Sequence, residues 1–187
     1  ELPKTEWEFV VFDNDAINAF ALPGGKVGVY TGLIELVDSD DELAAVIGHE
    51  IAHVACRHGN KRMSQGIGIA LGGVLLDRSM SDKDRSDRQV ARLGYGVGSQ
   101  LLVALPYGRK QETEADDRGL MYAALAGYDP RASVTFWKKM KAKSKVRPPE
   151  FLSTHPDTDN RIAFLESKMD QAMRIYRQSK AARGETP

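Results

Sequence analysis

Hydrophobic and polar positions along the chain follow two different periods, and the change from one to the other divides the sequence. Residues 7–13, 17–22 and 26–30 form short runs rich in β-branched and aromatic residues, separated by a polar turn at 13–15 and by a proline and two glycines at 23–25. These runs predict a small antiparallel sheet. From residue 39 onward the predicted elements are helices. The predicted fold is therefore α+β and mostly helical, with the small sheet packed on the first long helix.

Capping residues place the ends of the predicted helices. Ser39 and Glu42 can cap the first long helix, which runs to His58 and stops at Gly59, since glycine tolerates the left-handed conformation past a helix end. Later helices are expected from about residue 60, from about 86 to 106, from about 108 to 127, from 130 onward and over about 158–180.

Two stretches between these helices differ from the rest in composition. Residues 66–76, GIGIALGGVLL, form an apolar run that is too short to span a bilayer, so we interpret it as a buried or interfacial helix. Residues 77–87 are charged and lack a hydrophobic period, and we interpret them as a mobile surface loop.

The length and charge of the chain limit the number of domains and the kinds of partner that can be expected. With 187 residues it is long enough for one domain with a core and too short for two comfortable ones, so we expect a single domain over residues 1–187. Lysine plus arginine equals aspartate plus glutamate at 26 each, so the charge balance gives no reason to expect nucleic acid or an anionic membrane as a partner. The chain begins at Glu1, and we expect any signal or membrane anchor to lie outside it.

The first long helix carries polar groups in an apolar setting. His49 and His53 are one turn apart, about 40° around the helix axis, and can bind one metal ion together. Glu50 is rotated by about 100° from His49, where it can address a ligand of the ion without coordinating it. His-Glu-x-x-His on a helix is the recurring zinc-peptidase arrangement, although the motif alone also arises by chance. The apolar surroundings favour the metal site, because a buried glutamate needs polar partners.

His58 and Cys56, which follow this motif, are assigned no metal. On a continuous helix His58 is turned about 140° from His53 and is interpreted as a C-terminal helix residue that interacts favourably with the helix dipole. Cys56 is too far along the helix to join the same ion and is interpreted as a small buried residue. As the single cysteine it excludes an internal disulfide and a four-cysteine zinc cluster. A metzincin would carry histidine where this chain has Gly59, which excludes that subclass.

A carboxylate on a later helix is the expected third ligand. On the predicted helix after residue 108, Glu112 and Asp116 lie close to the centre of the apolar stripe, whereas Glu114 faces about 200° away from Glu112. Glu112 is therefore the candidate ligand. Asp116, one turn later, is suited to accept the free ring N–H of a metal-bound histidine. The alternative is that Glu112 is a solvated acid in the first turn of its helix.

Taken together, these motifs resemble a known family. HExxH at 49–53, ExEAD at 112–116 and STHP at 153–156 followed by Arg161 resemble the gluzincin peptidases of the HtpX and CAAX prenyl protease type. NAFALPGG at 18–25 and YTGLI at 30–34 are also similar to that family. The likeness covers about residues 7–165 and is closest to the soluble bacterial BepA and LoiP type. At 107–109 the chain keeps the arginine but not the serine that the family often has.

This resemblance implies a zincin-like metallopeptidase domain with one Zn²⁺ per chain. Its ligands would be His49, His53 and Glu112, in agreement with the helical geometry, and Glu50 would be the general base. The resemblance further implies an endopeptidase that cleaves extended polypeptides, unfolded or misassembled, in protein quality control. It implies a periplasmic or cell-envelope location in a bacterium, as a lipoprotein if an anchor precedes the chain.

Other residues are candidates for the rest of the site. His155, Arg161 and Tyr107 could stabilise the oxyanion, and His155 ranks first because a loop histidine before a proline can project into a cleft; the alternative is a surface histidine. His155 has a second possible role, since a neutral imidazole at the open coordination position would displace the catalytic water and inhibit the enzyme.

The second strand is the candidate for binding substrate. Asn18, Ala19 and Phe20 resemble the edge strand on which gluzincins bind an extended peptide through main-chain pairing. The alternative, a plain hairpin strand with Phe20 in the core, is compatible with this use of the backbone.

Two other functions stay open at this point. A binding module or chaperone-like factor could retain the metal site and rarely cleave, and a structural metal domain would have a closed site with four ligands. Glu50 favours catalysis, because a structural zinc ion needs no base beside it.

Overall fold

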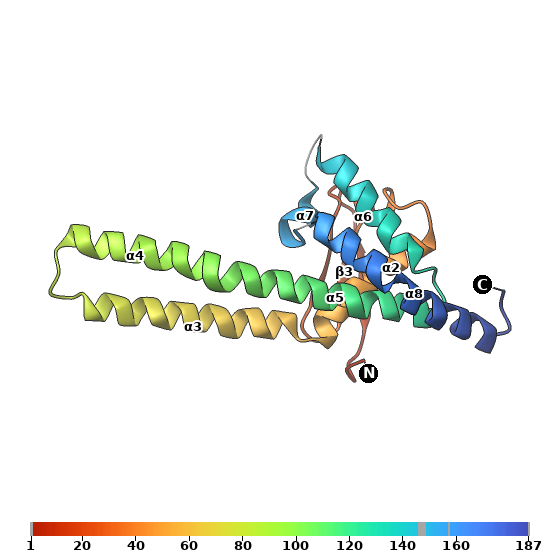
Figure 1. Ribbon diagram of the computed structural model, residues 1–187, viewed down its shortest axis with the longest axis horizontal. Helices are drawn as coiled ribbons and strands as arrows, with labels where there is room; N and C mark the ends of the chain where they lie inside the picture. The colour runs from red at the N-terminus through yellow and green to blue at the C-terminus, as the bar shows by residue number, and fades with distance from the viewer. Residues whose placement is uncertain (1, 146–148, 157, 187) are drawn as a thin grey trace.

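Two long antiparallel helices extend away from the rest of the molecule in the computed structural model, which describes residues 2–145, 149–156 and 158–186 (Figure 1). We call this hairpin the arm and the rest the body. The arm consists of α3 (His58–Ser79), α4 (Arg85–Ser99) and the π-helical turn that follows α4. This turn, η1 (Gln100–Ala104), joins α4 to α5 (Leu105–Ala126), which enters the body. The remaining elements are β1 (Glu8–Phe12), β2 (Ala19–Leu22), β3 (Lys26–Tyr30), α1 (Thr31–Ile34), α2 (Asp40–Ala55), α6 (Arg131–Ser144), α7 (Glu150–Thr154) and α8 (Thr158–Ala182).

The three strands form the predicted small sheet, but its pairing is mixed. The strand order is β1-β3-β2, with β3 antiparallel to β2 and parallel to β1. The prediction that the whole sheet is antiparallel was therefore wrong for β1. Consecutive strands that form a hairpin pair directly and run antiparallel. Here β3 lies between β1 and β2, so β1 pairs with β3 instead of β2, and this pairing is parallel. In this order β2 is an edge strand.

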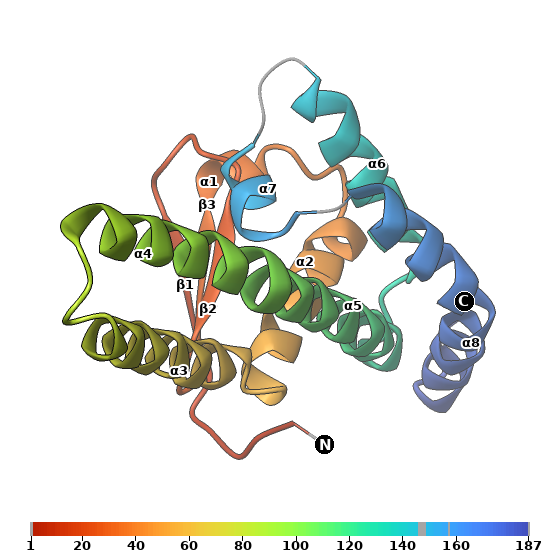
Figure 2. The ribbon, with the colours of Figure 1, turned by 60° about the vertical axis from the view of Figure 1, so that its left-hand side comes forward.

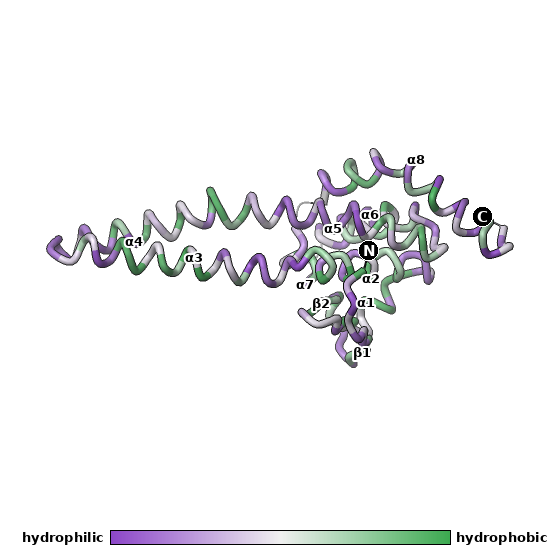
Figure 3. Tube along the Cα trace, turned by 90° about the horizontal axis from the view of Figure 1, so that it is seen from below, coloured by the Kyte–Doolittle hydropathy of each residue, from purple (hydrophilic) through white to green (hydrophobic). Residues whose placement is uncertain are grey.

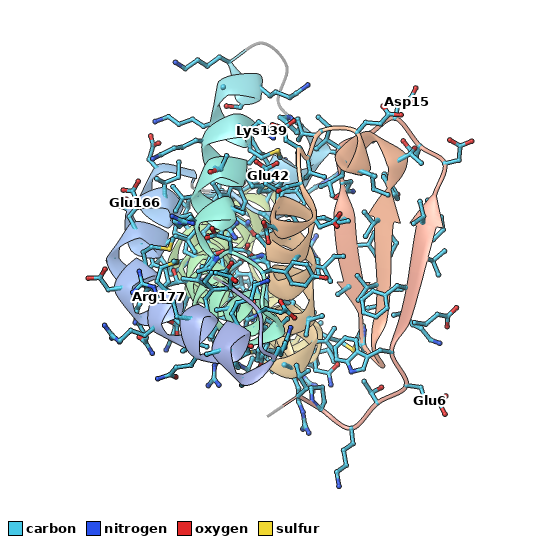
Figure 4. All side chains as sticks on the ribbon, turned by 90° about the vertical axis from the view of Figure 1, so that its right-hand side faces the viewer. Glu6, Asp15, Glu42, Lys139, Glu166 and Arg177 are labelled. Carbon is cyan, nitrogen blue, oxygen red and sulfur yellow. The ribbon has the colours of Figure 1, made fainter. Side chains whose placement is uncertain are left out.

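Helix α2 lies at the centre of the body, with the sheet on one side and α5, α6 and α8 on the other (Figure 4). The core side chains come from all of these layers. They are Ala19, Val27, Val29, Leu33, Val46, Leu120, Ala124, Val134, Phe136, Trp137, Met140, Phe151, Leu165, Ala172 and Tyr176. Helices α2 and α5 cross especially closely, because a Cβ on Gly48 would lie 2.8 Å from the carbonyl oxygen of Gly119. Only glycine allows this approach, which brings the polar faces of the two helices together.

The first turn of α2 is as predicted and its last turn is not. The Ser39 hydroxyl accepts a hydrogen bond from the backbone N–H of Glu42, 3.3 Å away, and caps the helix. The helix ends at Ala55, and Arg57 adopts the left-handed conformation with φ 55° that the sequence assigned to Gly59. His58 consequently starts α3 instead of ending α2.

The arm differs from the predictions in three places. The apolar run 66–76 is helical and contains no buried residue, so of the two interpretations the buried helix was wrong and the interfacial helix stays a prediction. Helix α3 continues to Ser79 and α4 begins at Arg85, so less of 77–87 is non-helical than predicted. The helix does not end near Pro106, which lies in the first turn of α5, where its missing N–H is tolerated after the π-helical turn. None of the helices in the described ranges is long and apolar enough to span a bilayer.

Candidate metal centre

Four buried side chains from three parts of the body converge between α2 and α5. His49 and His53 come from α2, Glu112 from α5, and His155 from the residue that follows α7. One donor atom from each of the four lies within 4.8 Å of the others. Each residue is less than 9% exposed. The structure thus brings together the three predicted ligands and adds His155 to them.

The donor atoms of this group approach as closely as hydrogen-bonded atoms do. His49 Nε2 lies 3.0 Å from His53 Nε2 and 3.2 Å from His155 Nδ1. His155 Nδ1 lies 2.8 Å from Glu112 Oε2. The His155 ring is held there by Phe151, which stacks on it with ring centroids 4.3 Å apart.

The position of the proton on His49 indicates which kind of ligand the four donors can bind. Its other ring nitrogen, Nδ1, lies 3.0 Å from Asp116 Oδ1, and a carboxylate can only accept, so a neutral His49 carries its proton on Nδ1. The Nε2 lone pair then points at the other three donors. Three imidazole nitrogens and a carboxylate that face one another this closely fit a divalent cation, and this donor set suits Zn²⁺. Asp116 is in the place that the sequence predicted for it.

The pKa values of the two histidines of the motif shift in opposite directions. Burial and the positive charge of Arg161 act to lower the pKa of His49, but its hydrogen bonds to Asp116 and Glu112 outweigh them and raise it to about 9. Burial lowers the pKa of His53 to about 3. Burial acts to raise the pKa of Glu112, but hydrogen bonds from the three histidines hold it well below its ordinary value. Glu112 is therefore an anion, as a metal ligand must be.

Glu50 lies beside the four donors and is 2% exposed. Its Oε1 has no hydrogen-bond partner within the described residues, and His155 Nε2 lies 3.4 Å from it. Burial raises the pKa of Glu50. A buried carboxylate oxygen without a partner is costly unless a ligand or water satisfies it.

Comparison with known proteins relates this centre to a defined group of enzymes. The sequence profile of Peptidase family M48 matches residues 1–169. The chain belongs to this family. Its M48 relatives include the mitochondrial metalloendopeptidase OMA1 of Arabidopsis thaliana, which is 37% identical over 185 residues. The beta-barrel assembly-enhancing protease of Escherichia coli is 33% identical over 186 residues.

The match covers nearly all of this chain and a minor part of each relative. It spans 97% of the chain and 36% of the Arabidopsis protein, and 94% of the chain and 37% of the E. coli protein. The chain is thus a member of Peptidase family M48, and the two relatives are named a metalloendopeptidase and a protease.

Arg161 is at the M48 centre, but not in the role predicted for it. Its Nε and Nη2 donate to the two oxygens of Asp116, at 2.7 and 2.5 Å, and its Nη1 donates to Glu112 Oε2 at 3.1 Å. The guanidinium also lies 3.8 Å above the Trp137 ring. Because these contacts engage the guanidinium, Arg161 holds the two carboxylates in place rather than pointing into an open cleft.

Tyr107 lies outside this group of residues. It is 44% exposed and lines a surface hollow together with Lys61, Lys110 and Glu114. The structure therefore does not bring Tyr107 to the four donors, where the sequence offered it as a candidate for stabilising the oxyanion.

The edge strand β2 approaches the centre with its last two residues rather than with the predicted Asn18, Ala19 and Phe20. Ala21 and Leu22 line a hollow that also contains His53 and Arg57. A second hollow opens next to Glu112, between Arg62 at the root of the arm and Pro156 after α7. The centre is therefore reached from two sides, and one of them carries the strand edge. Phe20 is half-buried, and its ring contacts Phe12 of β1 and Tyr30 of the adjacent strand β3.

Three residues near the centre were not identified from the sequence. Arg62 donates to Gln111 Oε1 at 2.7 Å and to Glu112 Oε1 at 3.0 Å. His58 and Glu114 contact each other and approach His53 from outside. His58 and Arg62 both follow the left-handed turn at Arg57, which redirects the chain after α2. No local pattern signals a left-handed arginine, so these contacts could not be found from the sequence.

Proposed function

We propose that this member of Peptidase family M48 is a zinc-dependent endopeptidase with His49, His53 and Glu112 as zinc ligands and Glu50 as general base. The buried, unpartnered Oε1 of Glu50 beside converging donors carries the proposal. When bound, zinc would supply a Lewis acid that polarises the scissile carbonyl and lowers the pKa of a coordinated water to about 7.

In this proposal the protein residues move the proton and hold the ligands. Glu50 takes a proton from the attacking water and delivers it to the departing amine, which its raised pKa favours because the acid form must persist long enough to be a donor. Asp116 keeps the His49 proton on Nδ1, and Arg161 fixes both Asp116 and Glu112.

His155 supports a further part of the proposal, which is inhibition. Its Nδ1 is within the same group of donors as the three ligands, so it can fill the position that a catalytic zinc site keeps open. In this arrangement the enzyme is inactive, and cleavage requires His155 to move away from the open coordination position. His155→Ala should raise activity if this holds, and lowered activity would instead favour a role in stabilising the oxyanion.

The substrate we propose is an extended polypeptide paired with the edge of β2. The strand edge beside His53 supports this, because main-chain pairing is largely indifferent to side chains and suits unfolded or misassembled proteins. The E. coli relative is named for enhancing β-barrel assembly and the Arabidopsis relative is mitochondrial, and we propose the cell-envelope task and location of the bacterial BepA-like branch for this chain.

The experiment that tests the proposal compares casein degradation by wild type and Glu50→Gln. The variant keeps the shape and the ligands, so we expect its zinc content to be unchanged and its activity to fall by about 10²–10⁴-fold. A chelator should abolish wild-type activity and added zinc should restore it. Equal activity in the variant would contradict the assignment of Glu50. Inactive wild type with a full zinc complement and an inactive His155→Ala would favour a chaperone-like binding protein.

A further inference from the structure

A chain of polar contacts leads outward from His53 to the root of the arm. His53 Nδ1 lies 2.8 Å from His58 Nδ1. His58 Nε2 lies 3.1 Å from Glu114 Oε2, and Lys61 Nζ lies 3.5 Å from the same oxygen. His58 is only 1% exposed, so its ring nitrogens cannot be satisfied by bulk water.

The same residues also have the composition of a cation site. One donor atom each from Cys56, His58 and Glu114 lie within 4.8 Å of one another. A thiolate, an imidazole and a carboxylate are ligands that Zn²⁺ accepts. The position of the protons on the two histidines distinguishes between a second cation and a hydrogen-bonded chain.

The orientation of His53 fixes these protons. Its Nε2 faces the four-donor centre, 3.0 Å from His49 Nε2, so the nitrogen that would bind the ion carries no proton. The proton is then on Nδ1 and is donated to His58 Nδ1, which must be the unprotonated nitrogen of that ring. His58 consequently carries its proton on Nε2 and donates it to Glu114. A nitrogen that donates to Glu114 cannot bind a cation, so the contacts favour the hydrogen-bonded chain.

We propose that His58 and Glu114 are positioning residues for His53, fixing the tautomer and ring orientation with which it binds zinc. They do for His53 what Asp116 does for His49, with one imidazole inserted between the ligand and the carboxylate. This inference rests on the proposed zinc site. Since His58 is the first residue of α3 and Glu114 lies on α5, the chain of contacts crosses the root of the arm (Figure 2).

Zinc affinity, measured by competition with a chromophoric chelator, tests this proposal without relying on activity. His58→Phe removes the acceptor while keeping a ring, and we expect its zinc dissociation constant to rise about 10–100-fold. His58→Asn restores an acceptor oxygen and should recover most of the affinity, which a purely structural role of the ring would not explain. Equal affinity of His58→Phe and wild type would overturn the proposal.

Two further measurements keep the result interpretable. Glu114 is partly exposed, so Glu114→Ala should fold even if His58→Phe does not, and we expect a several-fold loss of zinc affinity from it. Unchanged affinity in Glu114→Ala would count against the chain. Wild type that binds no zinc would refute the zinc site itself, a different outcome from a variant that binds normally.

The cation alternative is tested with Cd²⁺, because the four-donor centre contains no sulfur. A cadmium–thiolate absorption band in wild type that disappears in Cys56→Ala would show that Cys56, His58 and Glu114 bind a cation, and the proposal would fail. We expect a single equivalent of Cd²⁺ to bind without such a band.

Discussion

Apolar and polar residues alternate along both the body and the arm (Figure 3), but the two regions differ in which apolar side chains are buried. In the body a core of apolar side chains is buried between the sheet and the helices, although the apolar residues of β1 are exposed. Between α3 and α4 the Tyr95 ring lies against Gly72 and Gly73, and its hydroxyl donates to the Ile69 carbonyl oxygen at 2.7 Å. The large apolar side chains of the arm are exposed, namely Met63, Ile67, Leu71, Val74, Leu75, Val90, Leu93, Val97, Leu101, Leu102 and Val103.

This difference indicates that the metal centre is stabilised by the core of the body and not by the arm. Its ligands lie on α2, α5 and the residue after α7, all of which pack on the core. Beyond its root the arm contributes almost no buried side chain, with none in α4. We therefore expect substitutions of the same kind to have large effects in the body and small or opposite effects in the arm.

Truncation of a large apolar side chain should give the largest contrast. Phe136 is 1% exposed, so Phe136→Ala should lower the free energy of unfolding by about 3–5 kcal/mol. Leu102 is 80% exposed, and Leu102→Ala should change it by less than about 0.5 kcal/mol. Urea denaturation of the two variants measures both values. Similar losses would mean that the arm is buried against something in solution.

Substitution of glycine by alanine should give the next largest effect on the free energy of unfolding, with opposite signs in the body and in the arm. A Cβ on Gly119 would lie 2.7 Å from the backbone nitrogen of His49, so Gly119→Ala should cost about 1–3 kcal/mol and weaken zinc binding by displacing α2. A Cβ on Gly68 meets no atom of the described residues within 4 Å, so Gly68→Ala should stabilise the helix by up to about 1 kcal/mol. Thermal unfolding and chelator competition report the two effects, and a neutral Gly119→Ala would contradict the close crossing of α2 and α5.

Removal of an ion pair should give the smallest difference between the body and the arm in the free energy of unfolding. In the body, Lys139 Nζ donates to the buried Glu42 at 2.6 Å and to Asp38 at 2.7 Å, so Lys139→Met should cost about 1 kcal/mol by leaving Glu42 without its cation. In the arm, Arg92 and Asp77 form an exposed pair, and Arg92→Met should have no measurable effect.

The pH dependence of the melting temperature tests how Lys139 contributes to the stability of the folded state. Burial acts to lower the pKa of Lys139, but the hydrogen bonds to Asp38 and Glu42 raise it above 10.5. A group with a raised pKa in the folded state stabilises fully below its ordinary pKa and loses that contribution as the pH rises through the folded pKa. The difference in melting temperature between wild type and Lys139→Met should therefore be constant from neutral pH to about pH 10 and shrink above it. A difference that grows at alkaline pH would contradict the ion pair.

The sequence predicted the centre of the body better than its connections. His49, His53 and Glu112 could be placed because a helix repeats every 3.6 residues, so that residues on one face identify themselves by spacing. The parallel pairing of β1 and the left-handed Arg57 could not, since each depends on contacts between segments distant in sequence. His58 was misplaced for this reason. The apolar run at 66–76 was assigned to a buried or interfacial helix because periodicity gives no information on which neighbour covers an apolar face.

The most direct test of the central claim is X-ray diffraction at the zinc absorption edge, from crystals of protein purified without chelators and supplied with zinc. We expect one anomalous peak per chain, within coordination distance of Nε2 of His49, Nε2 of His53 and the carboxylate of Glu112. A zinc ion bound elsewhere, or full zinc occupancy with Glu112 turned away from the two histidines, would contradict it.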